Sequence, residues 1–263
     1  MWNIFLLLDY YRVFGAILCF ILGAIIGSFL EVVVDRVPKG ESIISPPSHC
    51  PYCGHRLEPK DLIPIVSYFI LKGKCRYCGK KIPFPIIETL VALLFAFLYL
   101  KFDLGILFIK FAIFVMFLVS VSFIDLYYGI VYDAMVMPGA LLGLICGFLT
   151  HTLRDSLLGV LFFGVTFALI ILISKLFYKE GGMGEGDLTT GIMIGAFLGV
   201  KYGIIAFFLS FFIGAVAGML MMVIGKKDRK SAIPFVPYLA TGSVISIFLG
   251  NSIIAFYLNL FKM

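Results

Sequence analysis

The sequence predicts an all-α polytopic membrane protein with about eight transmembrane helices, and its composition is the first observation that does so. Of its 263 residues, 62% are hydrophobic and only 14% are charged, and the mean hydropathy is +1.09. Soluble globular domains are about half apolar and about a quarter charged. This composition therefore excludes an ordinary soluble protein.

Segment length is the second observation, because a helix needs about 20 mainly apolar residues to cross a bilayer. The sixth of the eight predicted spans is short and glycine-rich, so we expect it to be tilted, partly re-entrant or packed inside the bundle. The apolar stretch that follows Arg12 is too long for the core of a signal peptide, so we expect a retained first helix. The predicted spans cover residues 13–34, 84–100, 105–126, 134–150, 156–177, 188–200, 202–224 and 234–260.

The third observation is the uneven distribution of lysine and arginine. Fifteen of the 21 basic residues fall in the loops after the first, fifth and seventh spans, and only five fall on the opposite side. Cytoplasmic loops carry such an excess, so we expect these loops in the cytoplasm and both termini outside. The net charge of +6 then reflects topology and attraction to anionic membrane lipid, and we expect no nucleic-acid partner.

One long hydrophilic segment, residues 35–82, lies between the first two spans and contains the motifs CPYCG at 50–54 and CRYCG at 75–79. Four thiolates with this spacing suit one tetrahedral zinc ion and leave no open coordination position, which indicates a structural role. Disulfides or unrelated thiols are the alternative, and a cytoplasmic loop disfavours disulfides. The predicted Zn²⁺ ligands are Cys50, Cys53, Cys75 and Cys78.

The expected organisation is a first transmembrane helix (1–34), a cytoplasmic zinc-ribbon-like insert (35–82) and a seven-helix membrane domain (83–263). His49 and His55 adjoin the first cysteine motif. They are either competing metal ligands or, in the simpler interpretation, exposed loop residues.

The chain has only fifteen acidic residues, so each can be considered individually. Several, including Asp61 and Asp155, fall in predicted loops and need no special role. Asp133 stands immediately before the fourth span, where an aspartate serves as a helix N-cap. Seven acids are expected at or near the cytoplasmic membrane surface: Glu31, Asp35, Glu88, Asp125, Asp133, Glu185 and Asp187.

Two of these acids are candidates for catalysis. Asp125 ends the third span, and Asp187 precedes the sixth; the alternatives are a helix-end polar residue and a helix cap. Two carboxylates a few ångström apart cannot both ionise easily, so one keeps a proton while the other acts as a base. Such a pair activates water for attack on a peptide carbonyl and protonates the leaving amine. The helix dipoles suggest that the proton resides on Asp125 and the charge on Asp187.

Capping alone does not explain the glycines around Asp187. The segment GGMGEGDLTT at 181–190 places Glu185 between Gly184 and Gly186. These glycines predict a sharp turn that another backbone, such as a substrate peptide, can approach closely. A turn without a chemical role would also use glycines.

These residues resemble the type IV prepilin peptidases, also called bifunctional leader peptidase/N-methyltransferases, over nearly the whole chain. The resemblance places the family's catalytic pair on Asp125 and on Asp187 of its G-x-G-D signature. It is carried by GSFLEVVVDRVP at 27–38, the two cysteine motifs, DLIPIVSYFILKGKCRYC at 61–78, IPFPIIETL at 82–90, FIDLYYGIVYD at 123–133, MGEGDLTTGIMIGAFLG at 183–199 and AIPFVPYLATG at 232–242.

The resemblance implies an eight-helix aspartyl peptidase of the bacterial inner membrane with a cytoplasmic active site. Members of the family cleave the basic leader of prepilin or pseudopilin precursors after a glycine. Bifunctional members then methylate the new amino terminus with S-adenosylmethionine. The sequence leaves the particular pilin-like substrate, the metal and the oligomeric state open.

This chain departs from the family at three places. It has Glu31 where an asparagine is usual, Tyr132 where a proline is usual and Thr189 where a lysine is usual. Both aspartates are retained, so the peptidase is less affected than the methyltransferase, which is attributed to the N-terminal part. A peptidase without methyltransferase activity is therefore an alternative.

Gly23, Gly27, Glu31 and Asp35 share one face of the first span at four-residue steps, which predicts close packing against another helix. We expect Glu31, together with Glu88, to hold the cationic leader or the new amino terminus. The alternative is that these acids pair with Arg36 or with neighbouring basic side chains.

Two functions of other classes are alternatives to the peptidase. A transporter would use intramembrane acids as ion sites near the bilayer midplane and would show repeated halves, whereas these acids cluster at one surface. A non-catalytic pilus or secretion assembly factor would use the zinc insert for docking and would tolerate loss of both Asp125 and Asp187.

Overall fold

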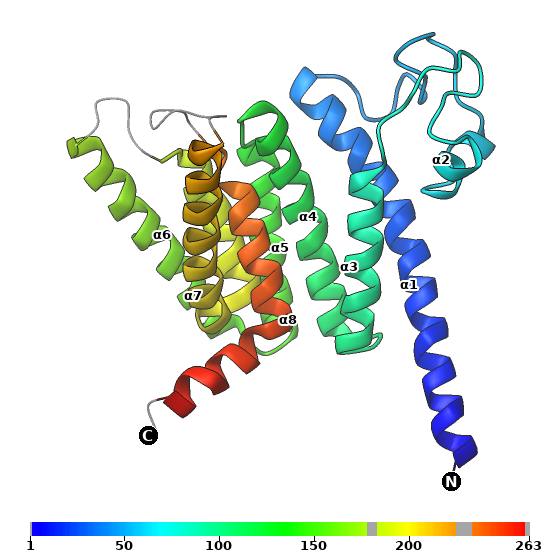
Figure 1. Ribbon diagram of the computed structural model, residues 1–263. Coiled ribbons are helices and arrows are strands. Elements are labelled where there is room, and N and C mark those ends of the chain that lie inside the picture. Colours follow the sequence, from blue (N-terminus) through cyan, green and yellow to red (C-terminus); the bar gives the residue numbers. More distant parts are fainter. Residues whose placement is uncertain (1, 178–182, 225–232, 261–263) are drawn as a thin grey trace. The chain divides into compact units, whose positions relative to one another are not determined.

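The computed structural model describes residues 2–177, 183–224 and 233–260, and in these ranges it contains helices and loops but no β-strand. The all-α prediction is therefore confirmed. The insert contains α2 (Val66–Ile70) and two short 3₁₀ turns, Val37–Lys39 and Pro59–Asp61. The long helices are α1 (Trp2–Arg36), α3 (Ile86–Phe102), α4 (Ile106–Tyr128), α5 (Asp133–Leu149), α6 (Leu153–Phe177), α7 (Glu185–Val223) and α8 (Val236–Leu260) (Figure 1).

The chain divides into two units, residues 1–120 and 121–263, with the boundary inside α4. In the first unit α1 and α3 lie side by side and run in opposite directions. Glycines on α1 make this possible: a Cβ on Gly23 would lie 2.8 Å from the Cα of Ala92, and one on Gly27 would lie 2.6 Å from the Cα of Glu88. The predicted small-residue face of the first helix is therefore confirmed.

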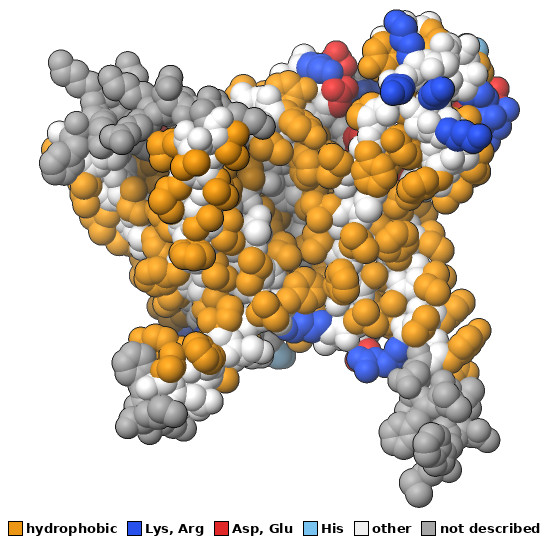
Figure 2. All heavy atoms as spheres, viewed as in Figure 1, with side chains coloured by type: hydrophobic (Ala, Val, Ile, Leu, Met, Phe, Trp, Pro, Cys, Tyr) orange, Lys and Arg blue, Asp and Glu red, His pale blue; other side chains and the backbone are white. Residues whose placement is uncertain are grey.

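The insert is a lobe at the end of this helix pair, where α1 ends and α3 begins (Figure 1). Charged side chains gather on this lobe, whereas the visible face of the helices is mostly hydrophobic (Figure 2). The chain inside the lobe has little regular secondary structure. A segment of this kind needs another source of stability, such as a bound metal.

In the second unit α7 folds back on itself at Gly199, whose backbone (φ 72°, ψ −179°) is not helical. The Phe167 ring of α6 shows this reversal, because residues on both sides of the bend contact it. A Cβ on Gly191 would lie 2.4 Å from this ring, while Phe207 packs against the same ring from beyond the bend, with 5.8 Å between ring centroids. The two halves of α7 correspond to the sixth and seventh predicted spans.

Asp155, at the start of α6, stabilises this bend. Its carboxylate accepts a hydrogen bond from the backbone N–H of Val200 at 3.3 Å, at the start of the second half of α7. Helix α6 and the first half of α7 approach each other closely because a glycine of one faces a glycine of the other. A Cβ on Gly159 would lie 2.4 Å from the carbonyl oxygen of Gly195. The interpretation of Asp155 as a loop acid without a special role is therefore wrong: it lies in the first turn of α6 and makes the contact with Val200.

Replacing Gly199 by alanine is expected to destabilise the second unit. The backbone conformation at this position is essentially restricted to glycine, which gives a cost of about 1–3 kcal/mol. In addition, the new Cβ would clash with the Asp155 carboxylate. Thermal unfolding in detergent measures the effect, with Gly164→Ala on α6 as the control, because the nearest atom there is 3.8 Å away. Equal melting temperatures for the two variants would contradict this account.

Helices occupy all eight predicted span positions in the described parts of the chain. Within the described ranges, five helical stretches are long and apolar enough to cross a membrane: Tyr10–Lys39, Ile106–Tyr128, Leu153–Leu176, Glu185–Val223 and Val236–Leu260. A shorter apolar helix, Asp133–Leu149, lies among them. The chain is therefore a multi-pass membrane protein. The count of eight crossings stays a prediction.

Candidate active site and metal centre

Asp125 lies in the last turn of α4, and the structure explains why that helix ends there. Gly129 has a positive φ of 67°, and its N–H donates to the carbonyl oxygen of Asp125 at 2.8 Å. A glycine in the left-handed region just past the last turn is a common helix terminator. The Asp125 side chain is 6% exposed, so its carboxylate is held inside the protein.

The buried Asp125 carboxylate has a specific partner at the start of α8. Its Oδ2 accepts a hydrogen bond from the backbone N–H of Val236 at 3.1 Å. Val236 is the first residue of α8 and lies between Pro234 and Pro237, which have no N–H to donate. Asp125 therefore satisfies one of the donors that the first turn of a helix leaves without a partner.

Asp187 lies in the first turn of α7 and is partly buried. Its Oδ2 accepts a hydrogen bond from the backbone N–H of Gly184 at 3.2 Å. The capping role considered as the alternative is therefore real. The capping role does not exclude a catalytic one, since the hydrogen bond from Gly184 occupies only one of the two carboxylate oxygens.

The two aspartates belong to the same unit, and the Asp125 carboxylate is close enough to Asp187 for the two charges to repel each other. Each lies at the N-terminus of a helix: Asp125 at that of α8 and Asp187 at that of α7. The prediction that the proton resides on Asp125 and the charge on Asp187 rests on the dipoles of α4 and α7. With α8 included, the dipoles no longer distinguish the two carboxylates.

The glycines of the signature have different local roles. A Cβ on Gly186 would lie 2.5 Å from the Cβ of Val131, so this glycine lets the loop after α4 pack against the start of α7. A Cβ on Gly184 would lie 3.6 Å from the Asp187 carboxylate. Glu185 is exposed and lies 3.8 Å from the Lys175 ammonium. Approach of a substrate to these three residues stays a prediction.

The predicted N-cap at Asp133 is wrong by one position. Tyr132 is the N-cap residue of α5 and makes no side-chain cap hydrogen bond, while exposed Asp133 is the first helical residue. An acid in the first turn still interacts favourably with the helix dipole. Asp133 thus has a structural role without the predicted bond.

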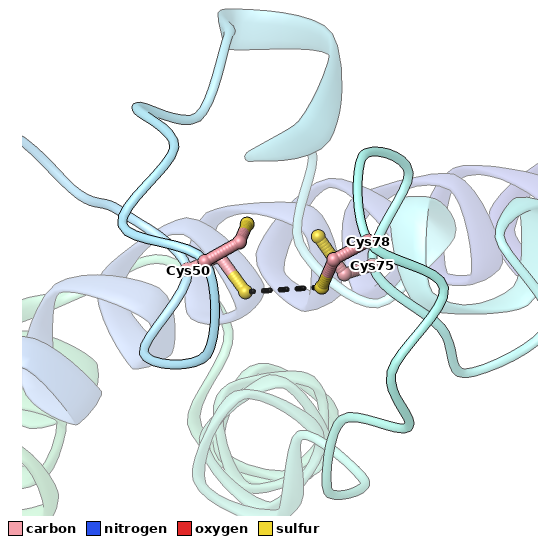
Figure 3. Close-up of side chains that lie close together, drawn as sticks. Cys50, Cys75 and Cys78 are labelled. Atoms are coloured by element: carbon pink, nitrogen blue, oxygen red, sulfur yellow. Dashed lines mark hydrogen bonds between the residues drawn. The ribbon is translucent and has the colours of Figure 1, made fainter.

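The four cysteines come together in the insert as predicted. Their sulfur atoms all lie within 4.8 Å of one another, and Cys50 Sγ is 3.9 Å from Cys78 Sγ (Figure 3). Tetrahedral Zn²⁺ with Zn–S bonds of about 2.3 Å would place sulfur atoms about 3.8 Å apart. The sulfur positions therefore fit a zinc ion. The histidines are not in the cluster: His49 contacts the Pro47 carbonyl, and His55 stacks on Tyr77.

Each cysteine motif forms the same tight turn. The N–H groups of Gly54 and Gly79, both with positive φ, donate to the carbonyl oxygens of Cys50 and Cys75 at 2.9 and 3.0 Å. Burial works against ionisation of Cys50, but N–H groups of Tyr52 and Cys53 outweigh it and lower the pKa of the Cys50 thiol to about 7. The turns therefore favour at least one thiolate, the form that binds metal.

Asp61 connects the second cysteine motif to the rest of the insert. Its side chain is 2% exposed and accepts hydrogen bonds from Arg76 Nε at 2.6 Å and from the Tyr77 hydroxyl at 2.9 Å. Burial opposes its charge, but these hydrogen bonds hold the pKa of Asp61 below its usual range. The sequence suggested no role for Asp61, because its partners are 15 and 16 residues away.

Replacing Asp61 by asparagine is expected to weaken the insert by about 1–3 kcal/mol, since charged hydrogen bonds inside it are lost. We expect the variant to release its metal to a chelator faster than the wild type does. The absorbance of the chelator–metal complex measures the rate. Glu41→Gln is the control in the same insert, because Glu41 is an exposed acid. Equal release rates from the two variants would show that Asp61 is not structurally important.

Glu31 and Glu88 also lie together, on α1 and α3 of the first unit. Glu31 is partly buried, and its charge is repelled by Glu88 and, to a lesser extent, Asp35. Glu88 is buried and accepts a hydrogen bond from the backbone N–H of Ile65 at 2.8 Å. Arg36 donates instead to the Ser42 carbonyl, so it does not provide the predicted alternative pairing. No ion pair among the described residues includes Glu31 or Glu88.

Comparisons with known proteins assign the chain to a family. Residues 21–102 match the bacterial peptidase A24 N-terminal domain, and residues 112–219 match the type IV leader peptidase family. The chain is also 35% identical to a prepilin leader peptidase/N-methyltransferase of Bacillus subtilis, over 92% of this chain and 97% of that protein. This chain belongs to the type IV leader peptidase family.

Other relatives with the same name support the assignment to the type IV leader peptidase family. The Pseudomonas aeruginosa protein is 32% identical over 92% of this chain and 93% of its own length, and the Xanthomonas campestris protein is 31% identical over 90% and 92%. No solved structure gives a significant match. The first family match contains the cysteine cluster, Glu31 and Glu88, and the second contains Asp125 and Asp187.

Proposed function

We propose that this chain is a membrane aspartyl endopeptidase that removes the basic leader from type IV prepilin-like precursors after a glycine and then methylates the new amino terminus. The observation that carries the proposal is the approach of Asp125 and Asp187 on separate helices of one unit, in a chain of the type IV leader peptidase family. Its relatives are named for both activities.

Hydrolysis is assigned to the aspartate pair. The ionised carboxylate takes a proton from water, and the hydroxyl oxygen forms a bond to the scissile carbonyl carbon. The protonated partner donates its proton to the carbonyl oxygen. The C–N bond then breaks as the leaving amine accepts a proton from the carboxyl group that had taken it from water, while the other carboxylate takes a proton back from the former carbonyl oxygen. The Val236 and Gly184 N–H groups hold one oxygen of each carboxylate in place, so the carboxylates are oriented before substrate binds.

The membrane arrangement follows from the distribution of basic residues. With eight crossings, the fold-back at Gly199 makes the two halves of α7 separate spans, and both termini lie outside. The aspartate pair and the insert then face the cytoplasm, where the basic leader of the substrate is located. The basic loop segments at 178–182 and 225–232 lie outside the described residues. They contribute to this proposal through the sequence alone.

The cysteine cluster is assigned to one structural zinc ion. A membrane helix pair fixes the ends of the insert, and the four thiolates close its two turns around the metal. Four protein ligands fill a tetrahedral site, so zinc has no position for substrate.

The carboxylates of Glu31 and Glu88 are assigned to the cationic leader or the new amino terminus. Both belong to the half of the chain that matches the family's N-terminal domain. S-adenosylmethionine supplies the methyl group when bound. Because Glu31 replaces the usual asparagine, a peptidase without methyl transfer is the second candidate.

Replacing Glu31 by glutamine is expected to raise the KM for a leader containing lysine or arginine by about 3- to 10-fold, because one charge-assisted contact is worth about 1 kcal/mol near a surface. Methylation is expected to fall if the same carboxylate holds the new amine. Kinetics with charged and neutral leader peptides measure the first effect, and the mass of the product measures the second. Glu41→Gln, an exposed acid of the insert, is the control. Unchanged cleavage and methylation in Glu31→Gln would remove this assignment.

The two activities are tested together by incubating membranes that contain this chain with a pilin-like precursor and determining the mature amino terminus by mass spectrometry. Cleavage after the glycine, with a methyl group added only when S-adenosylmethionine is present, is the expected result. Cleavage without methylation supports the peptidase alone. Intact precursor would overturn the proposed function and favour a transporter or an assembly factor.

A further inference from the structure

The insert presents an apolar surface that its own core does not cover. The surface belongs to the segment Leu62–Lys74, which includes α2. In this segment Phe69 is 64% exposed and Ile70 is 65% exposed. Three further apolar side chains are more than 40% exposed: Leu62, Ile63 and Val66. Hydrophobic groups on this scale normally mark a contact with a partner or a membrane.

Charge indicates which partner fits the Leu62–Lys74 surface. Between Asp61 and Glu88 the sequence contains no acidic residue and five basic ones: Lys72, Lys74, Arg76, Lys80 and Lys81. Lys72 and Lys74 are exposed and directly follow α2. Apolar side chains next to lysines, without acids, are the composition of a segment that lies in the interface of an anionic bilayer.

The surface is also continuous with the start of a membrane helix. The rings of Tyr68 and Phe69 pack against that of Phe84, with centroid distances of 5.4 and 6.4 Å, just before α3 begins. Phe84 and Ile86 are themselves 43% and 52% exposed. Figure 2 shows hydrophobic side chains on the side of the insert toward α1 and α3, and basic side chains on its outer sides.

A second contact fixes the position of α2 relative to α3. The N–H of Ile65, immediately before α2, donates to the buried carboxylate of Glu88 in the first turn of α3. Ile65 has a positive φ of 62°, a conformation that is unfavourable for a β-branched residue. The structure therefore holds α2 beside the first turn of α3, where the apolar helix begins. The unfavourable backbone conformation of Ile65 is the energetic cost of this arrangement.

We propose that the Leu62–Lys74 surface is a membrane contact. Its apolar side chains enter the lipid leaflet beside the N-terminus of α3, and Lys72 and Lys74 meet anionic headgroups. The contact anchors the cysteine cluster close to the bilayer and keeps the Ile65 amide on Glu88. The inference depends on the chain being a membrane protein and does not depend on the proposed peptidase activity.

Tryptophan fluorescence can test the contact in the full chain, because the only native tryptophan is Trp2. In a Trp2→Phe background, Phe69→Trp and Ile70→Trp each place one reporter on the surface. The control is Tyr52→Trp, since Tyr52 is 51% exposed and lies in the first cysteine motif, outside the surface. Each variant is placed at one copy per nanodisc containing anionic phospholipid with brominated acyl chains.

In brominated lipid, both reporters on α2 are expected to show about half of the fluorescence that they show in non-brominated lipid. This degree of quenching is expected for side chains that lie about 5–10 Å inside the boundary between headgroups and acyl chains. The Tyr52→Trp control is expected to change little. Adding Lys72→Glu and Lys74→Glu to the Ile70→Trp variant should reduce its quenching. The proposal would be overturned if neither α2 reporter were quenched more strongly than the Tyr52→Trp control. Absence of quenching at one copy per disc, together with a blue shift of the reporter emission that occurs only at several copies per disc, would instead assign the surface to contact between two chains.

Discussion

Asp125→Asn and Asp187→Asn are each expected to lower the rate of precursor cleavage by about 10²- to 10⁴-fold, the contribution typical of a general acid or base. Asparagine has nearly the same shape as aspartate and keeps an oxygen that accepts the N–H of Val236 or Gly184. The substitution therefore removes the proton-transfer function while it retains the structural hydrogen bond. Densitometry of precursor and mature protein over time measures the rates.

Asp133→Asn is the matched control for both variants. Asp133 lies in the same unit, close in sequence to Asp125, but it is exposed and makes no cap hydrogen bond. It should retain the wild-type rate within about twofold, because surface substitutions change stability by about 0.5 kcal/mol or less. If Asp133→Asn were as slow as the other two, the loss would reflect a general sensitivity of this region and not a catalytic pair.

Cys50→Ser is expected to abolish stoichiometric metal binding and unfold the insert. Structural zinc contributes about 10–16 kcal/mol of apparent binding free energy in small zinc-binding peptides at neutral pH, so the lobe has no comparable substitute for it. Two measurements test this expectation: the metal content per chain after purification, and the rate at which protease cuts the segment 42–64 in membranes. Removal of the metal from the wild type with a chelator should reproduce the faster cleavage.

Cys19→Ala is the control for the metal prediction. Cys19 is buried in α1, outside the sulfur cluster, so this variant should keep one metal ion per chain. Wild-type metal content in Cys50→Ser would contradict the assignment of the cluster. A metal-free Cys50→Ser protein with an intact, protease-resistant insert would show that the metal binds without supporting the fold.

Local sequence patterns predicted the parts of the sites that depend on local structure. The two Cys-x-x-Cys-Gly motifs gave all four members of the sulfur cluster, since each motif closes its own turn around a glycine with positive φ. Asp125 and Asp187 could be selected because charged groups are costly at the ends of apolar helices and therefore few. The apolar segments predicted the positions of the helices, and the glycines of the first helix predicted that another helix packs closely against it; the structure identifies that helix as α3.

Contacts between residues far apart in the sequence could not be predicted. The Val236 N–H that orients Asp125 is 111 residues away, and the Val200 N–H capped by Asp155 is 45 residues from it. Asp61 likewise looked like an ordinary loop acid until Arg76 and Tyr77 were placed around it. The N-cap at Asp133 was misplaced because a helix boundary depends on a single residue's backbone angles, which local composition specifies poorly.

The central claim is that Asp125 and Asp187 work as one catalytic unit, and the double variant Asp125→Asn/Asp187→Asn tests it most directly. Residues that act as a unit show strongly non-additive losses. The cleavage rate of the double variant, measured beside both single variants at equal protein in the same membranes, is therefore expected to match that of the slower single variant. Losses that multiply, or a double variant that cleaves at the wild-type rate, would contradict the account.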